Sequence, residues 1–242
     1  MTTATKSFPA LPEWVHIREA VPEDATAAAQ CHIWSWGNTF SHLFSAEYGA
    51  KLPSTLQANA ERQLGLITSY SKEAQSGVRP RNGLYLVAVG NPPVETGVPF
   101  GGSSVEEWSR VGPTNERVLG IAYYFVLNEN SARLSFHEEE VKAGNGRIVD
   151  LFAFHFVEEA QGNGVAINVF KRGVEMVLND LEASKMRLWT QEANAKARAF
   201  YTKKAGGREI GTYVCPLGDT DVTRMCLEWT REELEQWLQK NS

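Results

Sequence analysis

The segment from Gln161 to Ala166 has the residue types and spacing of an anion-binding turn. It reads Gln161-Gly162-Asn163-Gly164-Val165-Ala166 and stands where a run of β-branched and aromatic residues gives way to a helical pattern. Glycines let a chain pass close to a ligand, and the first amide N–H groups of a helix point outward, unpaired, at its positive dipole end. We therefore expect the backbone amides of this turn to bind a pyrophosphate.

Two familiar glycine-rich turns do not fit the segment. No Gly-Lys-Ser/Thr follows it, which excludes a Walker-type loop. A nicotinamide-binding turn needs a third glycine at a fixed place and an acidic residue about twenty positions on, where Thr190 and Gln191 stand instead. No second arginine or lysine is expected near the turn, so bound phosphates would be held more by backbone amides than by side-chain charge. The preceding Glu158 and Glu159 are interpreted as solvated loop acids.

The elements around the turn form a strand, a helix and a second strand. Arg147 to Val157 predicts a long strand, Gly164 to Leu181 repeats apolar residues at helical spacing, and Lys185 to Gln191 predicts another strand. Such a crossover makes its two strands parallel. Asn194 to Lys204 predicts a further helix, which Gly206-Gly207 would end by allowing a left-handed backbone.

The rest of the chain predicts helices and antiparallel strands. We expect a strand at Val15–Arg18, helices at Ala25–Phe40 and Pro53–Ile67, an antiparallel pair at Leu84–Val89 and Val118–Val126, and a closing hairpin of Glu209–Val214 with Thr223–Trp229. Gly90 to Glu116, dense in Gly, Pro and Ser, predicts a flap or a simple insertion. The fold class is α/β (α+β), one domain over residues 1–242, with a mixed, mostly antiparallel sheet of about six to seven strands.

Composition narrows the class of protein. The chain has 242 residues, 43% of them apolar, which is enough to bury the core of a globular enzyme. The formal net charge of −5, without a run of Lys and Arg, argues against a nucleic-acid partner. No leader or membrane-spanning stretch is evident, so we expect a cytoplasmic protein with no membrane partner, compatible with a homodimer. Cys31, Cys215 and Cys226 suit neither a disulfide framework nor a metal site, and a symmetric hairpin would set Cys215 opposite Val222.

Two motifs in register resemble those of the GNAT superfamily of N-acetyltransferases. Gln161 to Ala166 matches the (Arg/Gln)-x-x-Gly-x-(Gly/Ala) signature of that family. Asn194-x-x-Ala197-x-x-Phe200-Tyr201, followed by Lys204-Ala205-Gly206-Gly207, is similar to its second motif, and Ile17 to Asp24 resembles its opening strand and helix. The resemblance implies the GNAT fold and acetyl-CoA (coenzyme A) bound at the turn. It also implies that the pantetheine arm pairs with free backbone groups near Phe154, His155 and Phe156, and that Asn194 bonds either this arm or its own helix.

The same resemblance assigns an acid and a base. Tyr201 would protonate the leaving thiolate, unless it only packs at a helix edge. Asp150 would accept the ammonium proton, unless it is a strand-end aspartate bonded to the backbone or to Arg147. Strand alternation puts Asp150 on one face with Ile148, Phe152, Phe154 and Phe156, and His155 on the other; a β-bulge would reverse this. Burial among these apolar residues would raise the pKa of Asp150 toward a useful value.

The acceptor is the least defined part of the prediction. Trp34, Trp36 and Phe40 fall where GNAT members form the acceptor pocket, and rings can hold a cation, although aromatic residues at helical spacing are also ordinary core. The predicted function is N-acetyl transfer from acetyl-CoA to a primary amine, with a small molecule as the partner. The alternative is a GNAT-shaped acyl-CoA sensor or scaffold without turnover.

Overall fold

The computed structural model describes residues 9–43, 45–91, 110–111, 115–128, 140–141, 143–144, 146–217 and 220–241. Its strands form one mixed sheet in the order β1-β2-β4-β5-β6-β8-β7, with the two-residue β3 beside β4. Only β5 and β6 pair in parallel, and the other neighbours are antiparallel. The strands are β1 (Val15–Glu19), β2 (Gly83–Gly90), β3 (Arg110–Val111), β4 (Glu116–Val126), β5 (Arg147–Phe156), β6 (Ala183–Gln191), β7 (Arg208–Leu217) and β8 (Thr220–Thr230). This confirms the predicted fold class.

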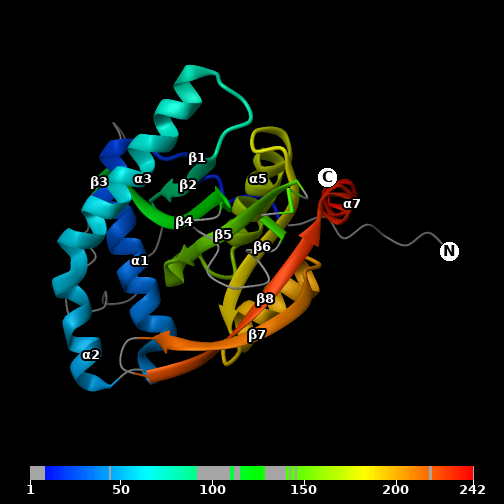
Figure 1. Ribbon diagram of the computed structural model, residues 1–242. Helices are drawn as coiled ribbons and strands as arrows, with labels where there is room; N and C mark the ends of the chain where they lie inside the picture. The colour runs from blue at the N-terminus through cyan, green and yellow to red at the C-terminus, as the bar shows by residue number, and fades with distance from the viewer. Residues whose placement is uncertain are drawn as a thin grey trace.

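Helices cover both faces of the sheet. One face carries α1 (Ala25–Phe40) and α3 (Leu56–Ser76), and the other carries α5 (Val165–Asn179) and α7 (Arg231–Lys240), as Figure 1 shows. The short α2 (Ala46–Lys51) joins α1 to α3, and α6 (Ala195–Ala199) continues into a π-helical turn over Phe200–Lys204. Sequence patterns missed α2 and α7, although Thr230 and Glu233 form the capping box that begins α7.

A glycine sets the distance between α5 and the sheet. A Cβ atom added to Gly173 would lie 2.0 Å from the hydroxyl oxygen of Tyr124 on β4, closer than atoms can approach. Glycine at this position therefore lets α5 pack directly on the ring of Tyr124. The close contact fixes the N-terminal end of α5, and with it the Gln161–Ala166 turn, relative to the strands.

The parallel strands β5 and β6 separate halfway along their length. They pair from Arg147 and Ala183 as far as Leu151 and Leu188, after which β5 runs on to Phe156 and β6 to Gln191. We call this opening the splay. Of its two strands, β5 precedes the Gln161–Ala166 turn in the chain, separated from it by a short 3-10 turn at Glu158–Ala160, and β6 follows α5.

A β-bulge in β5 overturns the predicted facing of Asp150. Tyr124 on β4 is opposite Leu151, but the preceding Tyr123 is opposite Ala153, so Phe152 is an extra residue. An extra residue reverses the alternation of side chains beyond it. Asp150 therefore shares the α1–α3 face with His155, whereas Phe154 and Phe156 face α5. The expectation that Asp150 lies in one row with Phe154 and Phe156, opposite His155, was wrong.

The closing hairpin and the end of the helical segment agree with the sequence patterns. The three cysteines are free, and Cys215 is opposite Val222 in the closing hairpin. Gly206, with a φ of 75°, ends the helical segment that contains Tyr201. Most of the expected Gly90–Glu116 insertion lies outside the described residues, apart from Gly90–Asn91, the strand β3 and Asn115–Glu116. Within the described ranges, no helix is both long and apolar enough to cross a membrane.

Candidate active site

The Gln161–Ala166 turn has the backbone of an anion-binding loop. Gly162 and Gly164 have φ values of 81° and 78°, which only glycine adopts readily. Gly164 is the N-cap of α5, so the amides of Val165 and Ala166 begin the helix without intrahelical carbonyl partners. The Asn163 side chain donates to the Glu159 carbonyl oxygen at 2.8 Å and holds the turn. Gln161, Gly162 and Asn163 are exposed, so this part of the turn is open to a ligand.

The charges near the turn differ from those expected. Glu159 is not a solvated acid, because its carboxylate pairs with Arg117 at 3.2 Å and both side chains are buried. The expectation of a turn without a cation was also wrong, since the Lys196 ammonium from α6 donates to the Gln161 side-chain oxygen. Sequence spacing gave no indication of this contact, because α6 lies a whole strand beyond the turn. The turn thus has a cation beside its open part and a neutralised acid behind it.

The N-terminal segment borders the turn on its other side. A Cβ atom added to Gly164 would lie 2.9 Å from Cγ of Pro9, and the Asn168 side chain donates to the Pro9 carbonyl oxygen at 3.0 Å. Asn168 also donates to the carbonyl oxygen of Gly164 at 2.9 Å. Pro9 therefore covers the Gly164 side of the turn and leaves the Gln161–Asn163 side open.

Backbone groups on both strands face the splay. The Val157 amide donates to the Leu119 carbonyl oxygen on β4 at 2.9 Å, so by alternation the N–H and C=O groups of Phe154 and Phe156 point away from β4. Those of His155 point toward β4. One of the free acceptors is taken, because the Gln161 side chain donates to the Phe156 carbonyl oxygen at 3.2 Å.

The facing strand is arranged in the same way. The Glu192 amide donates to the Thr223 carbonyl oxygen on β8 at 2.9 Å, so the backbone groups of Trp189 and Gln191 point away from β8. The Gln191 carbonyl oxygen accepts a hydrogen bond from the Asn194 amide at 3.0 Å. Within the described residues, β5 and β6 do not pair with each other beyond Leu151 and Leu188. An extended amide-bearing chain could therefore pair with both strands there.

Tyr201 lies beside the splay with its hydroxyl unbonded. Its ring centroid is 6.0 Å from that of Phe154, and the side chain is buried. Burial raises the pKa of the phenol, and no hydrogen bond to a described residue offsets this shift. Tyr201 belongs to the π-helical turn, in which the Ala205 amide donates to the Phe200 carbonyl oxygen. Such turns are frequent at functional sites, and sequence periodicity gave no sign of this one.

Asn194 has a structural role in the protein as described. Its Oδ1 atom accepts a hydrogen bond from the Ala197 amide at 3.0 Å and so caps α6. This is the helix-capping alternative left open by the sequence. The cap fixes the start of the helical segment that carries Lys196 and Tyr201.

Asp150 and His155 meet on the α1–α3 face. Asp150 is 8% exposed and lies in register with Phe125 on β4 and Arg187 on β6. The His155 ring packs on His32 of α1, with centroids 4.7 Å apart. Burial lowers the pKa of His32 to about 4 and that of His155 well below its ordinary value. The face therefore holds two imidazoles that are neutral at physiological pH, in addition to a carboxyl group.

The three aromatic residues predicted for an acceptor pocket differ in burial, although the rings of Trp36 and Phe40 are in edge contact with centroids 6.0 Å apart. Trp34 and Phe40 are 7% and 5% exposed and belong to the hydrophobic core. Trp36 is half-buried, and its ring centroid is 6.2 Å from that of His32. Of the three, Trp36 is the one that borders the histidine pair.

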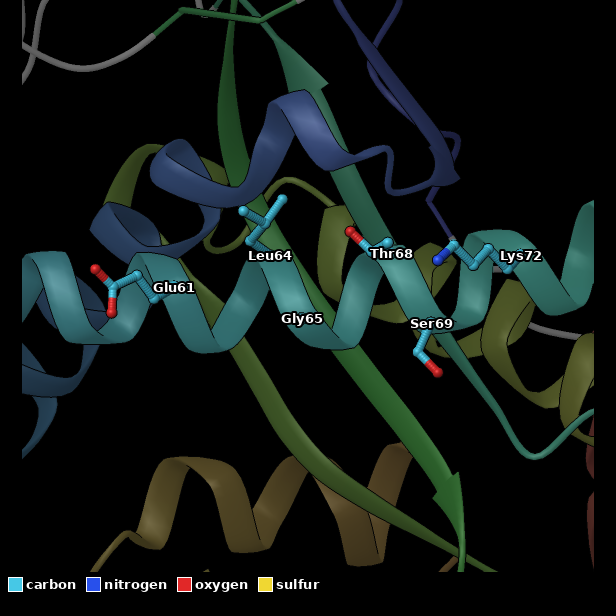
Figure 2. Close-up of a pocket in the computed structure, with 6 residues that line it drawn as sticks. All are labelled: Glu61, Leu64, Gly65, Thr68, Ser69 and Lys72. Carbon is cyan, nitrogen blue, oxygen red and sulfur yellow. The ribbon is translucent and has the colours of Figure 1, made fainter.

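A surface hollow elsewhere on the molecule is a poor alternative site. It has a volume of about 550 Å³ and is lined by Glu61, Leu64, Gly65, Thr68, Ser69 and Lys72. Figure 2 shows that all six residues lie on the single helix α3. The hollow has no second wall and none of the groups that face the splay.

Several solved structures share this architecture at low sequence identity. They include a PaiA N-acetyltransferase from Thermoplasma acidophilum in complex with coenzyme A, with a TM-score of 0.52, 15% identity, and coverage of 89% of this chain and 98% of that one. Arabidopsis thaliana NAA60 in complex with a bisubstrate analogue has a TM-score of 0.52 and 13% identity, with coverage of 89% of this chain and 98% of that one. A ribosomal-protein-S5-alanine acetyltransferase from Vibrio fischeri has a TM-score of 0.53 and 13% identity, with coverage of 93% of this chain and 97% of that one.

These likenesses establish the architecture. The chain has the fold of the GNAT acetyltransferases, as its motifs indicate. No protein-family model matches the sequence, and no curated protein matches it. The activity therefore has to be argued from the site itself.

Proposed function

We propose that this protein is an acetyl-CoA-dependent N-acetyltransferase that acts on a primary amine of a small molecule, with the whole chain as one acyltransferase domain. The observation that carries the proposal is the arrangement of the splay. Backbone groups of Phe154 and the Phe156 amide on β5 point into the splay, and the glycine turn follows shortly after this strand. That combination suits a ligand with an extended amide-bearing arm and a diphosphate at its end.

The residues fit such a ligand. The amides of Gly162, Asn163 and Val165, with the Lys196 ammonium, would hold the diphosphate. The backbone groups of Phe154 and Trp189 would pair with the pantetheine arm. Acetyl-CoA would supply the activated thioester. The protein would align the amine nitrogen with this thioester, since both the attack of the amine and the departure of the thiolate would take place within the splay.

Two proton transfers complete the reaction. An ammonium group must lose a proton before its nitrogen can attack, and the departing thiolate must gain one. Tyr201 suits the second transfer, because its raised pKa keeps the phenol protonated and its hydroxyl makes no competing bond in the described structure. For the first transfer we propose Asp150, directly or through water, with the neutral His155 as the second candidate on the same face.

The direct test is release of free thiol from acetyl-CoA in the presence of a panel of primary amines. Amine-dependent thiol release, together with the mass increase of one acetyl group on the amine, is the expected result. Binding of coenzyme A without turnover of any amine would support the sensor or scaffold alternative. Absence of both binding and turnover would refute the assignment to this class of enzyme.

A further inference from the structure

Four basic residues share the α1–α3 face of the sheet beyond β5. Lys185 and Arg187 lie on β6, Arg208 on β7 and Arg224 on β8. Carboxylates neutralise the first three. Lys185 donates to Glu140 at 2.7 Å, Arg187 donates to Glu228 at 2.6 and 2.8 Å, and Arg208 donates to Glu228 at 3.0 Å.

Arg224 is different from these three residues. It forms no ion pair within the described residues, and its buried Nε atom makes no hydrogen bond there. Its cross-strand neighbours are neutral, Gln191 on β6 and Tyr213 on β7. Burial and the Cys215 thiol raise the pKa of Tyr213, and the adjacent Arg224 guanidinium opposes that shift through its charge and a hydrogen bond to the phenol. A guanidinium is always charged, so a half-buried one without a counter-charge is suited to bind an anion.

The register places Arg224 one strand away from the splay. Gln191 and Arg224 are directly opposite each other in a pair without mutual backbone hydrogen bonds, the kind in which side chains lie closest. Gln191 ends β6, one of the two strands of the splay. Trp189, on the same face, packs against Tyr213 with ring centroids 4.7 Å apart. Arg224 is thus on the face that carries Asp150 and His155, and an acceptor amine approaching from that face would pass near it.

We propose that Arg224 binds a carboxylate of the acceptor, so that the substrate is an amine that also carries a carboxylate group. This inference rests on the proposed N-acetyltransferase activity and specifies its substrate class. A planar guanidinium matches a carboxylate with two parallel hydrogen bonds. One cation beside a neutral phenol suits a single negative charge better than the nearly double charge of a phosphate.

The test uses matched pairs of primary amines that differ only in bearing a carboxylate or the corresponding carboxamide, for example β-alanine and β-alaninamide. The wild type is expected to favour the carboxylate member by about 10- to 100-fold in kcat/KM, the range of a charge-assisted hydrogen bond. Arg224→Gln should abolish this preference by lowering kcat/KM for the carboxylate member. Arg231→Gln, which removes an arginine paired with Glu235 on α7, should preserve it.

Three outcomes would overturn the inference. Wild-type acetylation of both members at equal kcat/KM would remove it while leaving the proposed activity intact, and this comparison needs no variant to fold. If coenzyme A raised the Tm of Arg224→Gln less than it raises that of the wild type, Arg224 would bind the cofactor instead of the acceptor. Failure of the wild type to acetylate any amine would overturn the proposed activity and the inference together.

Discussion

At the scale of single residues, the site is defined by which buried polar groups face the splay. The hydroxyl groups of Tyr85 and Tyr124 are buried without hydrogen bonds in the described structure. Tyr201 belongs to the same hydrophobic core, but its ring packs on Phe154, whose backbone faces the splay. Position, rather than an unusual environment, separates the proposed acid from these other tyrosines.

The role of Tyr201 can be tested against that of Tyr124. Tyr201→Phe should lower kcat by about 100- to 10,000-fold, the usual contribution of a general acid. Its thermal shift with coenzyme A should stay at the wild-type value. Tyr124→Phe removes an unbonded buried hydroxyl, so it should keep kcat and retain or improve stability. Equal losses of kcat and coenzyme A affinity in Tyr201→Phe would mean that this side chain only shapes the binding site.

The histidine pair predicts how stability depends on pH. An imidazole titrates near pH 6.5 in an unfolded chain, whereas burial in the folded protein lowers the pKa of His32 to about 4 and that of His155 well below its ordinary value. Below about pH 6.5 the unfolded state therefore binds more protons, and the free energy of unfolding falls as the pH drops toward 4. His32→Asn should flatten this slope in urea unfolding measured from pH 7 to 4.5. The exposed His42→Asn should leave the slope unchanged; an identical slope in both variants would contradict the prediction.

At the scale of elements, sequence patterns predicted regular segments better than their irregularities. The strands at Leu84–Val89 and Val118–Val126 and the helix from Gly164 have unbroken periodicity, and all three appear close to their predicted bounds. The bulge at Phe152 adds one residue to the alternation of a strand, and the π-helical turn at Tyr201 adds one residue to a helical turn. Neither insertion is marked in the sequence by a special residue type. Both arise from tertiary packing, which is why the facing of Asp150 could not be read from alternation alone.

The turn offers a test of its glycines. Gly162→Ala and Gly164→Ala should each lower the free energy of unfolding by about 1–2 kcal/mol, because both positions have positive φ. Gly164→Ala should lower the free energy of unfolding more than Gly162→Ala does, since the added methyl group would also displace Pro9. Gly49→Ala in α2, where a Cβ atom meets nothing within 4 Å, should instead stabilise by up to about 1 kcal/mol. Similar effects at all three positions in urea unfolding would contradict this reading of the turn.

At the scale of the whole molecule, the splay divides the sheet. The strands β1, β2, β4 and β5 lie on one side of it, and β6, β8 and β7 on the other, with pairing between the halves limited to the first part of β5 and β6. Figure 1 shows α1 and α3 over the first half. A ligand bound along the splay would contact both halves, so its binding should stabilise the molecule as a unit. The strand order that creates this junction depends on pairings distant in sequence, so the sequence predicted the GNAT fold through the motif resemblance but not the order of the strands.

The most direct test is a thermal unfolding titration of the wild-type protein with coenzyme A. At a ligand concentration of about 100 times Kd, mass action adds about 2.7 kcal/mol, which raises the Tm of a chain of this size by roughly 5–10 °C. We predict a saturable rise of this order that is reduced in Gly162→Ala and in Lys196→Gln. An unchanged Tm at millimolar coenzyme A would show that the amides of Gly162 to Ala166 do not hold its diphosphate, and the account of this site would be wrong.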